Sequence, residues 1–278
     1  MQHIDEVNPM KFYRRVLTIA GSDSGGGAGI QADLKTIAAC GCYGTSAITA
    51  ITAQNTIGVT DIHSVPVATL EAQIRAVLDD IGTDAVKLGM LHSVEIIECV
   101  SRLLDEYKIT DVVLDPVMVA TSGDKLIEDD AIEALTKYLL PRARIITPNI
   151  PEAEILTGTH LPSAEDLEKS AVELGRTHRV SVLAKGGHLA GDELLDVLYD
   201  HQDGRTHHFS NRKRPTNNTH GTGCTLSSAI ASFIAKGLSV AAAAENGIAF
   251  VAQAIHSGAE YELGSGHGPV HHFHEYWK

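Results

Sequence analysis

The sequence predicts an α/β protein with a mainly parallel sheet and helices on both faces. Short apolar or β-branched runs alternate with helical patterns of about 10–15 residues, which is typical of βαβ units. Most of the apolar runs end in a glycine or in a polar residue. The composition agrees, because 44% hydrophobic and 21% charged residues suit a packed chain and exclude disorder.

The first half of the chain begins the alternation with a strand and a glycine-rich turn. Val16–Ala20 is an apolar run that leads into Gly21–Gly29, and a helical pattern follows to Ala39. Thr45–Thr52 is rich in β-branched residues and predicts a buried strand. Ala68–Ile81 has apolar residues at helical spacing with charges between them. The next elements are a strand, a helix and a strand at Ala85–Leu88, Val94–Tyr107 and Asp111–Leu114.

The second half continues in the same way and ends in two alanine-rich helices. Helices are expected at Asp130–Tyr138, Pro151–Leu156, Ala164–Thr177, Thr225–Ala235 and Val240–Gly258. Strands are expected at Arg144–Ile146 and Val180–Ala184, and a hairpin or meander at Leu194–Tyr199 and Arg205–Phe209. No linker, repeat or low-complexity segment interrupts the pattern. We therefore expect a short N-terminal extension, residues 1–15, and one domain over residues 16–278.

The charge and the cysteines limit the classes of partner and compartment. A net charge of −13 argues against nucleic acid or an anionic membrane surface as the main partner. No apolar run approaches the ~18 residues of a membrane span, and residues 1–15 contain no apolar core of a secretory leader. The four cysteines have no zinc-site spacing. We therefore expect a soluble, cytoplasmic protein with reduced thiols.

Polar or glycine residues follow nearly every predicted strand. They are Gly21–Gly29, Gln54 and Asn55, Gly89 and Met90, Asp115, Asn149, and Lys185–Gly187. Ligands collect at the carboxyl ends of such strands, so a carboxylate, an amide and a lysine there predict a magnesium–nucleotide site. Any one of them alone also fits an ordinary turn, because Asp-Pro and Pro-Asn are common turn dipeptides.

The segment Asn218–Ser227 carries the most chemistry. Gly221, Thr222 and Gly223 present bare backbone amides at the start of a predicted helix, where unpaired N–H groups favour phosphate. Cys224 lies in the same turn, where that field favours the thiolate. An inert, buried cysteine in an ordinary helix start is the alternative.

The sequence does not support either of two common nucleotide-binding motifs. Gly27, Gly29 and Ala32 fit the dinucleotide fingerprint, but no acidic residue occurs between Asp33 and Asp61 to hold a ribose. An oxidoreductase therefore loses most of its support. A Walker A loop is absent, because the sequence contains no Gly-Lys-Ser/Thr.

The chain resembles the hydroxymethylpyrimidine/phosphomethylpyrimidine kinases of thiamin biosynthesis, a branch of the ribokinase-like superfamily. The matching segments are Thr18–Lys35, Thr49–Asn55, Lys87–Leu91, Leu114–Met118, Thr147–Glu152, Lys185–His188, Asn218–Ser227 and Gly266–His274. The resemblance spans Val16 to Trp277. It implies a three-layer ribokinase-like fold, a homodimer, and ATP-dependent phosphorylation of 4-amino-5-hydroxymethyl-2-methylpyrimidine and then of its monophosphate, with ATP and Mg²⁺ as cofactors.

The resemblance also assigns the phosphoryl-transfer residues. Cys224 matches the catalytic base, whose pKa is expected to be lowered toward neutrality, and the amides of Gly221–Cys224 would stabilise the transferring phosphoryl group. Lys185 would neutralise phosphate charge. Asp115, Asn149, Glu152 and Thr222 match the nucleotide side, with Asp115 and Glu152 toward the metal.

The substrate side follows by the same resemblance. Asp33 and Gln54 match residues that grip the pyrimidine, and Gly21 and Val117 match pocket-lining positions. Met90 would lie against the ring face. A solvated helix face is the alternative for Asp33, and core packing is the alternative for Met90.

Four features are not expected to carry out the chemistry themselves. The resembled family needs no metal at the histidine-rich tail His267–His274, so we expect no zinc there. Cys40 and Cys42 are interpreted as packing, and the basic segment Arg212–Arg214 as a solvated loop. The glycine-rich helix start Gly221–Gly223 is called the anion turn below. His220 is expected to support this turn and not to act as the base.

Two other functions remain open. A pyridoxal or pyridoxine kinase would act on a ring of similar size that also bears a hydroxymethyl group, and dual specificity is included. A non-catalytic pyrimidine-binding regulator is opposed by the presence of Cys224, Asp115 and Lys185.

Overall fold

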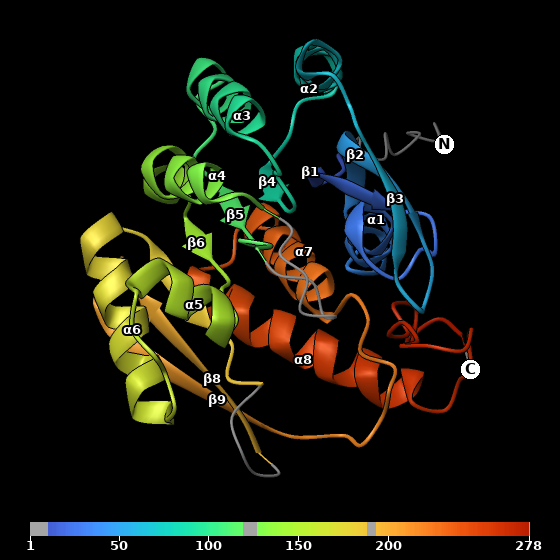
Figure 1. Cartoon of the computed structure of the whole chain (residues 1–278), viewed down its shortest axis with the longest axis vertical. Coiled ribbons are helices and arrows are strands. Elements are labelled where there is room, and N and C mark those ends of the chain that lie inside the picture. Colours follow the sequence, from blue (N-terminus) through green and yellow to red (C-terminus); the bar gives the residue numbers. More distant parts are fainter. Residues whose placement is uncertain (1–10, 119–126, 188–192, 278) are drawn as a thin grey trace, which may run out of the picture.

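The computed structural model describes residues 11–118, 127–187 and 193–277, which form one continuous sheet covered by helices on both faces (Figure 1). The strand order is β3-β2-β1-β4-β5-β6-β7-β8-β9. The six strands from β2 to β7 in this order are parallel, and β3, β8 and β9 pair antiparallel with their neighbours. The strands are Arg15–Asp23 (β1), Tyr43–Gln54 (β2), Val59–Ser64 (β3), Ala85–Leu88 (β4), Val112–Leu114 (β5), Ile145–Ile146 (β6), Ser181–Ala184 (β7), Glu193–Asp200 (β8) and Arg205–Arg212 (β9).

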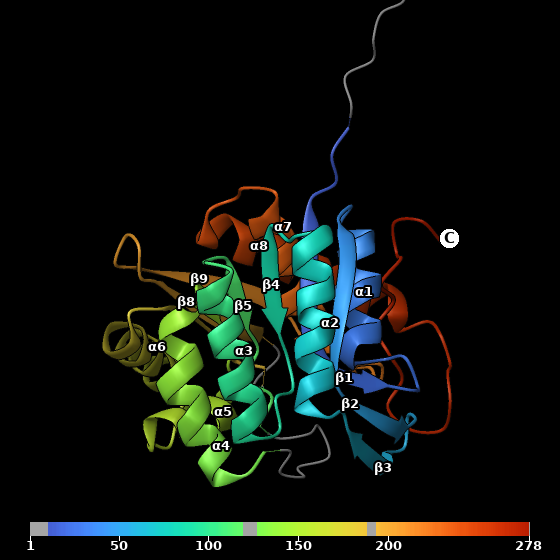
Figure 2. The ribbon, with the colours of Figure 1, turned by 90° about the horizontal axis from the view of Figure 1, so that it is seen from above.

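The helices divide between the two faces, which gives three layers (Figure 2). Helices α1, α7 and α8 pack on one face, and α2, α3, α4 and α6 on the other. Their bounds are Gly29–Ala39 (α1), Val67–Asp80 (α2), Val94–Glu106 (α3), Asp129–Ala134 (α4), Ile150–Thr157 (α5), Ala164–His178 (α6), Thr222–Ala235 (α7) and Val240–Gly258 (α8). A π-helical turn, Leu135–Leu139, and a short 3-10 turn, Leu140–Arg142, continue α4.

Two hydrophobic clusters hold the layers together, one on each side of the sheet. One cluster joins the sheet to α2, α3, α4 and α6, and the other joins it to α7 and α8. The parallel strands β4, β5, β6 and β7 are buried throughout, as strands between two helical layers must be. Lys87 in β4 is the one charged residue in these four strands.

The fold prediction is confirmed, with one strand missed. The structure has the three-layer α/β arrangement, and the expected hairpin is β8–β9. The missed strand is β3, an edge strand whose six residues are all exposed. The domain division remains a prediction that the continuous sheet supports, and residues 1–10 of the expected extension lie outside the described residues. Within the described ranges, no helix is both long and apolar enough to cross a membrane.

The C-terminal tail returns to the carboxyl edge of the sheet. The backbone N–H of His267 donates to the carbonyl of Thr56 at 2.9 Å, in the turn between β2 and β3. His220 then donates to the carbonyl of Gly268 at 3.0 Å and forms a bridge with Pro269. The tail therefore connects the end of β2 to the loop that precedes α7.

Candidate active site

The carboxyl ends of β5, β6 and β7 bring the predicted phosphate-side residues together. Asp115 follows β5, and its Oδ1 accepts from Lys185 Nζ at 3.2 Å and from Thr147 Oγ1 at 3.1 Å. Asn149 and Lys185 form a parallel bridge. Burial opposes ionisation, but Lys185 and Lys87 hold the pKa of Asp115 below its ordinary value. Asp115 is therefore an anion paired with a cation at the sheet edge.

The first turn of α7 faces this ion pair. Gly221 caps the helix with φ +81°, and a Cβ added at Gly223 would lie 3.5 Å from Asp115 Oδ2 and 3.6 Å from Lys185 Nζ. Thr222 begins the helix between these two glycines. Because the first amides of a helix lack partners within it, this turn is a suitable seat for a phosphate beside Lys185.

Glu152 lies against the same pair through the start of α5. Asn149 and Glu152 form a capping box, in which Glu152 Oε2 accepts from the Asn149 N–H at 2.8 Å and Asn149 Oδ1 accepts from the Glu152 N–H at 2.9 Å. Burial raises the pKa of Glu152 to about 7; Lys185 lowers it and Asp115 raises it further. Two carboxylates and an amide form the oxygen donor set that Mg²⁺ prefers, so these residues fit the predicted ion.

Asp33 is buried in a network of polar partners. Its side chain is fully buried, so the solvated helix face is wrong. Both oxygens lie 2.9 Å from Lys87 Nζ, and Thr18 and Ser228 donate to them at 2.6 and 2.8 Å. The contact with a pyrimidine remains a prediction; in this structure the carboxylate is held by partners from β1, β4 and α7.

Cys224 lies in the first turn of α7, half-buried. Burial raises the pKa of its thiol to about 11, although the Lys87 charge and a hydrogen bond from the Gly29 backbone oppose the rise. The nearby carboxylates of Asp33 and Asp115 raise it further. The predicted lowering of this pKa is therefore wrong for the protein without ligands, because burial outweighs the favourable field of the helix start.

The predicted ring-side residues Gly21, Gln54, Met90 and Val117 lie at or just beyond the ends of β1, β2, β4 and β5. A Cβ added at Gly21 would lie 2.7 Å from Met90 Cε, so the missing side chain makes room for the methionine. The Met90 carbonyl accepts from Thr49 Oγ1 at 2.9 Å. Met90 and Gln54 are both half-buried, and Val117, also half-buried, donates its N–H to the Asp115 carbonyl at 2.8 Å.

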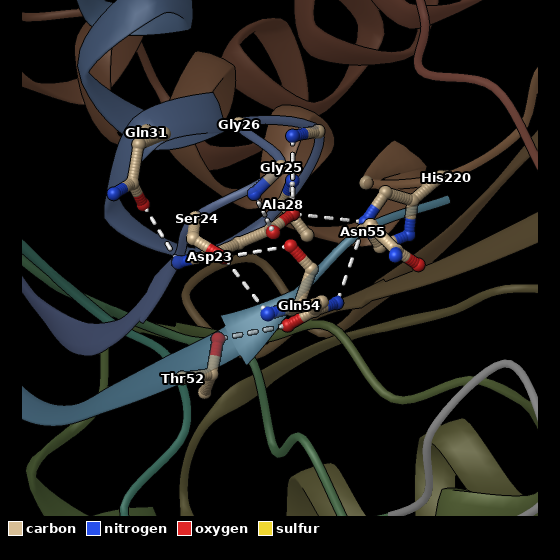
Figure 3. Close-up of polar contacts among 12 residues, drawn as sticks. Asp23, Ser24, Gly25, Gly26, Ala28, Gln31, Thr52, Gln54, Asn55 and His220 are labelled. Atoms are coloured by element: carbon tan, nitrogen blue, oxygen red, sulfur yellow. Dashed lines mark hydrogen bonds and ion pairs between the residues drawn. The ribbon is translucent and has the colours of Figure 1, made fainter. Parts of the chain in front are cut away.

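The glycine loop after β1 is organised by a residue that was not predicted (Figure 3). The Asp23 carboxylate accepts from the N–H groups of Gly25, Gly27 and Ala28 at 2.8, 3.0 and 2.8 Å. It also lies 2.9 Å from Nε2 of His220, directly before the anion turn. A Cβ at Gly221 would come within 1.8 Å of the Gly27 carbonyl oxygen, so the two glycine turns are in direct contact.

Lys87 and Asp23 are the residues that the prediction missed. Lys87 has a sequence signal, because a lysine inside an apolar four-residue strand needs a buried partner. Asp23 has only a weak one, an aspartate two residues before Gly25 that can accept from turn amides. Of the tail histidines, His272 packs against the first turn of α7. His272 is buried against Thr225, its Nε2 lies 3.2 Å from Thr225 Oγ1, and burial lowers its pKa to about 4.

Together, the fold and the site define a kinase of the ribokinase-like class. A phosphate seat at the start of a helix faces an Asp–Lys pair at the carboxyl edge of a mainly parallel sheet. A family model described as phosphomethylpyrimidine kinase matches residues 23–271. The chain belongs to this family.

Individual relatives agree with the family. The hydroxymethylpyrimidine/phosphomethylpyrimidine kinase of Bacillus subtilis is 46% identical over 267 residues, 95% of this chain and 96% of that protein. A thiamine biosynthesis bifunctional protein of Geobacter sulfurreducens is 48% identical over 92% of this chain, which spans 52% of that longer protein.

Solved structures include both kinds of vitamin kinase. The phosphomethylpyrimidine kinase of Clostridium difficile has a TM-score of 0.78 at 44% identity, over 87% of this chain and 99% of that one. The pyridoxal kinase of Staphylococcus aureus in complex with AMP-PCP and pyridoxal has a TM-score of 0.85 at 36% identity, over 96% of each chain. Identity is higher to the pyrimidine kinase, whereas the fold alone does not separate the two.

Proposed function

We propose that this chain uses ATP to phosphorylate 4-amino-5-hydroxymethyl-2-methylpyrimidine and then phosphorylates the monophosphate to the pyrophosphate. The observation that carries the proposal is the position of the α7 start. Gly223 faces the Asp115–Lys185 pair, whereas His220, just before the helix, lies 3.5 Å from the Gln54 side chain. The segment from His220 to Gly223 therefore lies between the expected phosphate site and the expected ring site.

The chemistry follows from the groups in this turn. The hydroxymethyl oxygen attacks the γ-phosphorus and loses its proton to the Cys224 thiolate. The bond from the γ-phosphorus to the bridging oxygen breaks, and ADP leaves. The amides of Gly221–Cys224 and the Lys185 ammonium stabilise the negative charge on the transferring group.

Magnesium fits beside Asp115, Glu152 and Asn149, where it would neutralise phosphate charge. The raised pKa of Glu152, about 7, gives this proposal a pH signature. Below that pH the carboxyl is mostly protonated, and a cation needs it ionised, so apparent Mg²⁺ affinity should rise from about pH 6 to about pH 8. Glu152→Gln should weaken Mg²⁺ activation and flatten this dependence. An unchanged profile in the variant would place the ion elsewhere.

The deciding experiment is a comparison of substrates with the purified protein. We expect kcat/KM for the hydroxymethylpyrimidine to exceed that for pyridoxal. A preference for pyridoxal would support the second candidate, which the likeness to pyridoxal kinases favours, and comparable values would indicate dual specificity. Binding of the pyrimidine without any phosphate transfer would support a non-catalytic regulator.

We further propose that the protein is a cytoplasmic homodimer whose domain begins near residue 16. Cys40, Cys42 and Cys99 are free and buried, and Cys224 is free, as expected for reduced thiols. The edge strand β3 offers a surface for a second copy.

A further inference from the structure

The Gln54 side chain lies between Thr52 and His220 at the end of β2 (Figure 3). Its Oε1 position is 3.2 Å from Thr52 Oγ1, and its Nε2 position is 3.5 Å from His220 Nε2. An amide can occupy nearly the same space in two orientations related by a half-turn, and the hydrogen-bond partners decide between them.

The hydrogen bonds of Thr52 show that the amide nitrogen of Gln54, and not its oxygen, faces Thr52. A threonine hydroxyl has one proton, and Thr52 Oγ1 lies 2.7 Å from the Ser22 carbonyl, which can only accept. The proton is therefore used, and Thr52 Oγ1 has only lone pairs to offer Gln54. The amide NH₂ is the group that can donate to it.

The contacts of His220 indicate the same orientation of the Gln54 amide, independently of Thr52. The Asp23 carboxylate accepts from the backbone N–H groups of Gly25, Gly27 and Ala28, and three such donors favour its ionised form. An ionised Asp23 can only accept, so the His220 nitrogen 2.9 Å away carries a proton. That N–H can also face a carbonyl, whereas a second N–H donor there would be repelled. The amide oxygen of Gln54 therefore faces His220.

We propose that Asp23 and His220 are positioning residues that fix the orientation of the Gln54 amide and so select the ring edge that the kinase binds. The inference rests on the proposed function. In this orientation one lone pair of the oxygen and one proton of the nitrogen stay open, side by side. They match an amine next to a ring nitrogen, the same donor–acceptor pair that glutamine recognises on adenine. A pyridine that carries a methyl group next to its nitrogen has no such pair.

Asp23 also holds three amides of the glycine loop, so the test must separate positioning from loop stability. A double-mutant cycle with His220→Ala and Gln54→Ala does so. The readout is the ratio of kcat/KM for the 4-aminopyrimidine alcohol to that for its analogue without the amine. We expect His220→Ala to lower this ratio about tenfold, mainly through KM, and to change it less than about twofold when Gln54 is already alanine.

A second variant keeps the test valid if alanine disturbs the loop. His220→Gln places an NH₂ near the position of Nε2, with one proton for Asp23 and one for Gln54, and should restore the ratio to within about threefold of wild type. Equal losses for both substrates, or a His220→Ala effect that persists without Gln54, would overturn the inference while the proposed function stands. A wild-type protein that phosphorylates neither compound overturns both.

Discussion

Cys224, the proposed base, is protonated in the protein without ligands because burial raises the pKa of its thiol to about 11. A thiol with a pKa of about 11 is only rarely ionised at neutral pH, and a general base must be ionised to accept a proton. The single-turnover rate of the wild-type kinase should therefore rise about tenfold per pH unit until it reaches the apparent pKa of the complex. Rapid-quench measurements at saturating substrates would record this profile.

Cys224→Ala is the matched variant for that profile. It should lower the single-turnover rate by about 10²–10⁴-fold, the usual contribution of a general base, and leave little pH dependence. A variant that keeps both the wild-type rate and the wild-type slope would show that another group, or water, accepts the proton.

The buried Lys87–Asp33 ion pair should contribute to the stability of the folded protein, and this contribution can be measured. Burial alone would lower the pKa of Lys87, but Asp33, Cys224 and Asp115 raise it above its ordinary value, so the pair is ionic. Lys87→Met leaves Asp33 buried without its cation and should reduce the free energy of unfolding by about 3–5 kcal/mol. Urea denaturation would measure this. Lys169→Met, on the exposed face of α6, should change stability by no more than about 0.5 kcal/mol and serves as the control.

The sequence could not assign this pair, although it placed both residues on the right elements. Asp33 and Lys87 are 54 positions apart, and Ser228, which completes the cluster, is 195 positions from Asp33. A local pattern contains no information about contacts between β4, α1 and α7. For the same reason, the sequence indicated the helix-start effect on Cys224 but not the burial that exceeds it.

At the scale of elements, the contact between the two glycine turns should be essential. Gly221→Ala places a Cβ at φ +81° and within 1.8 Å of the Gly27 carbonyl oxygen, so the loops must separate. A displacement of this kind near the chemistry can lower kcat about 10²-fold. Gly237→Ala is the control, since its φ is +89° but nothing lies within 4 Å of the new Cβ.

The two alanine variants should differ in activity more than in stability. The left-handed backbone alone costs about 1–2 kcal/mol, which both share. Thermal unfolding and steady-state kinetics on the same preparations would separate the effects. Similar kcat values in both variants would show that the contact between the turns is not needed for catalysis.

The elements that were predicted well are those with a buried face. The strand at Ala85–Leu88 and the helix at Val94–Glu106 were placed within a residue, because a fully buried strand gives an apolar run and a helix with one buried face gives an apolar periodicity. β3 left none. Its residues are all exposed, and it is a strand because Val59–Ser64 pairs antiparallel with the end of β2 just before it in the chain.

At the scale of the whole molecule, β3 ends the sheet and exposes apolar surface. Val59 and Ile62 on this strand are 43% and 50% exposed, and Ile51 and Ile57 nearby are 52% and 76% exposed. An edge strand with unpaired backbone groups and apolar side chains favours pairing with another chain. We therefore expect the proposed homodimer to form here.

Ile62→Lys tests this interface without touching the core. A lysine at the centre of a dimer contact must be desolvated, so the dimer dissociation constant should rise about tenfold or more. Sedimentation velocity over a range of concentrations would measure it. Ile155→Lys on α5 adds the same charge at a similarly exposed site, 41%, and should leave the dimer intact. If both variants dissociate equally, net charge and not β3 controls association, and if neither does, the second copy binds elsewhere.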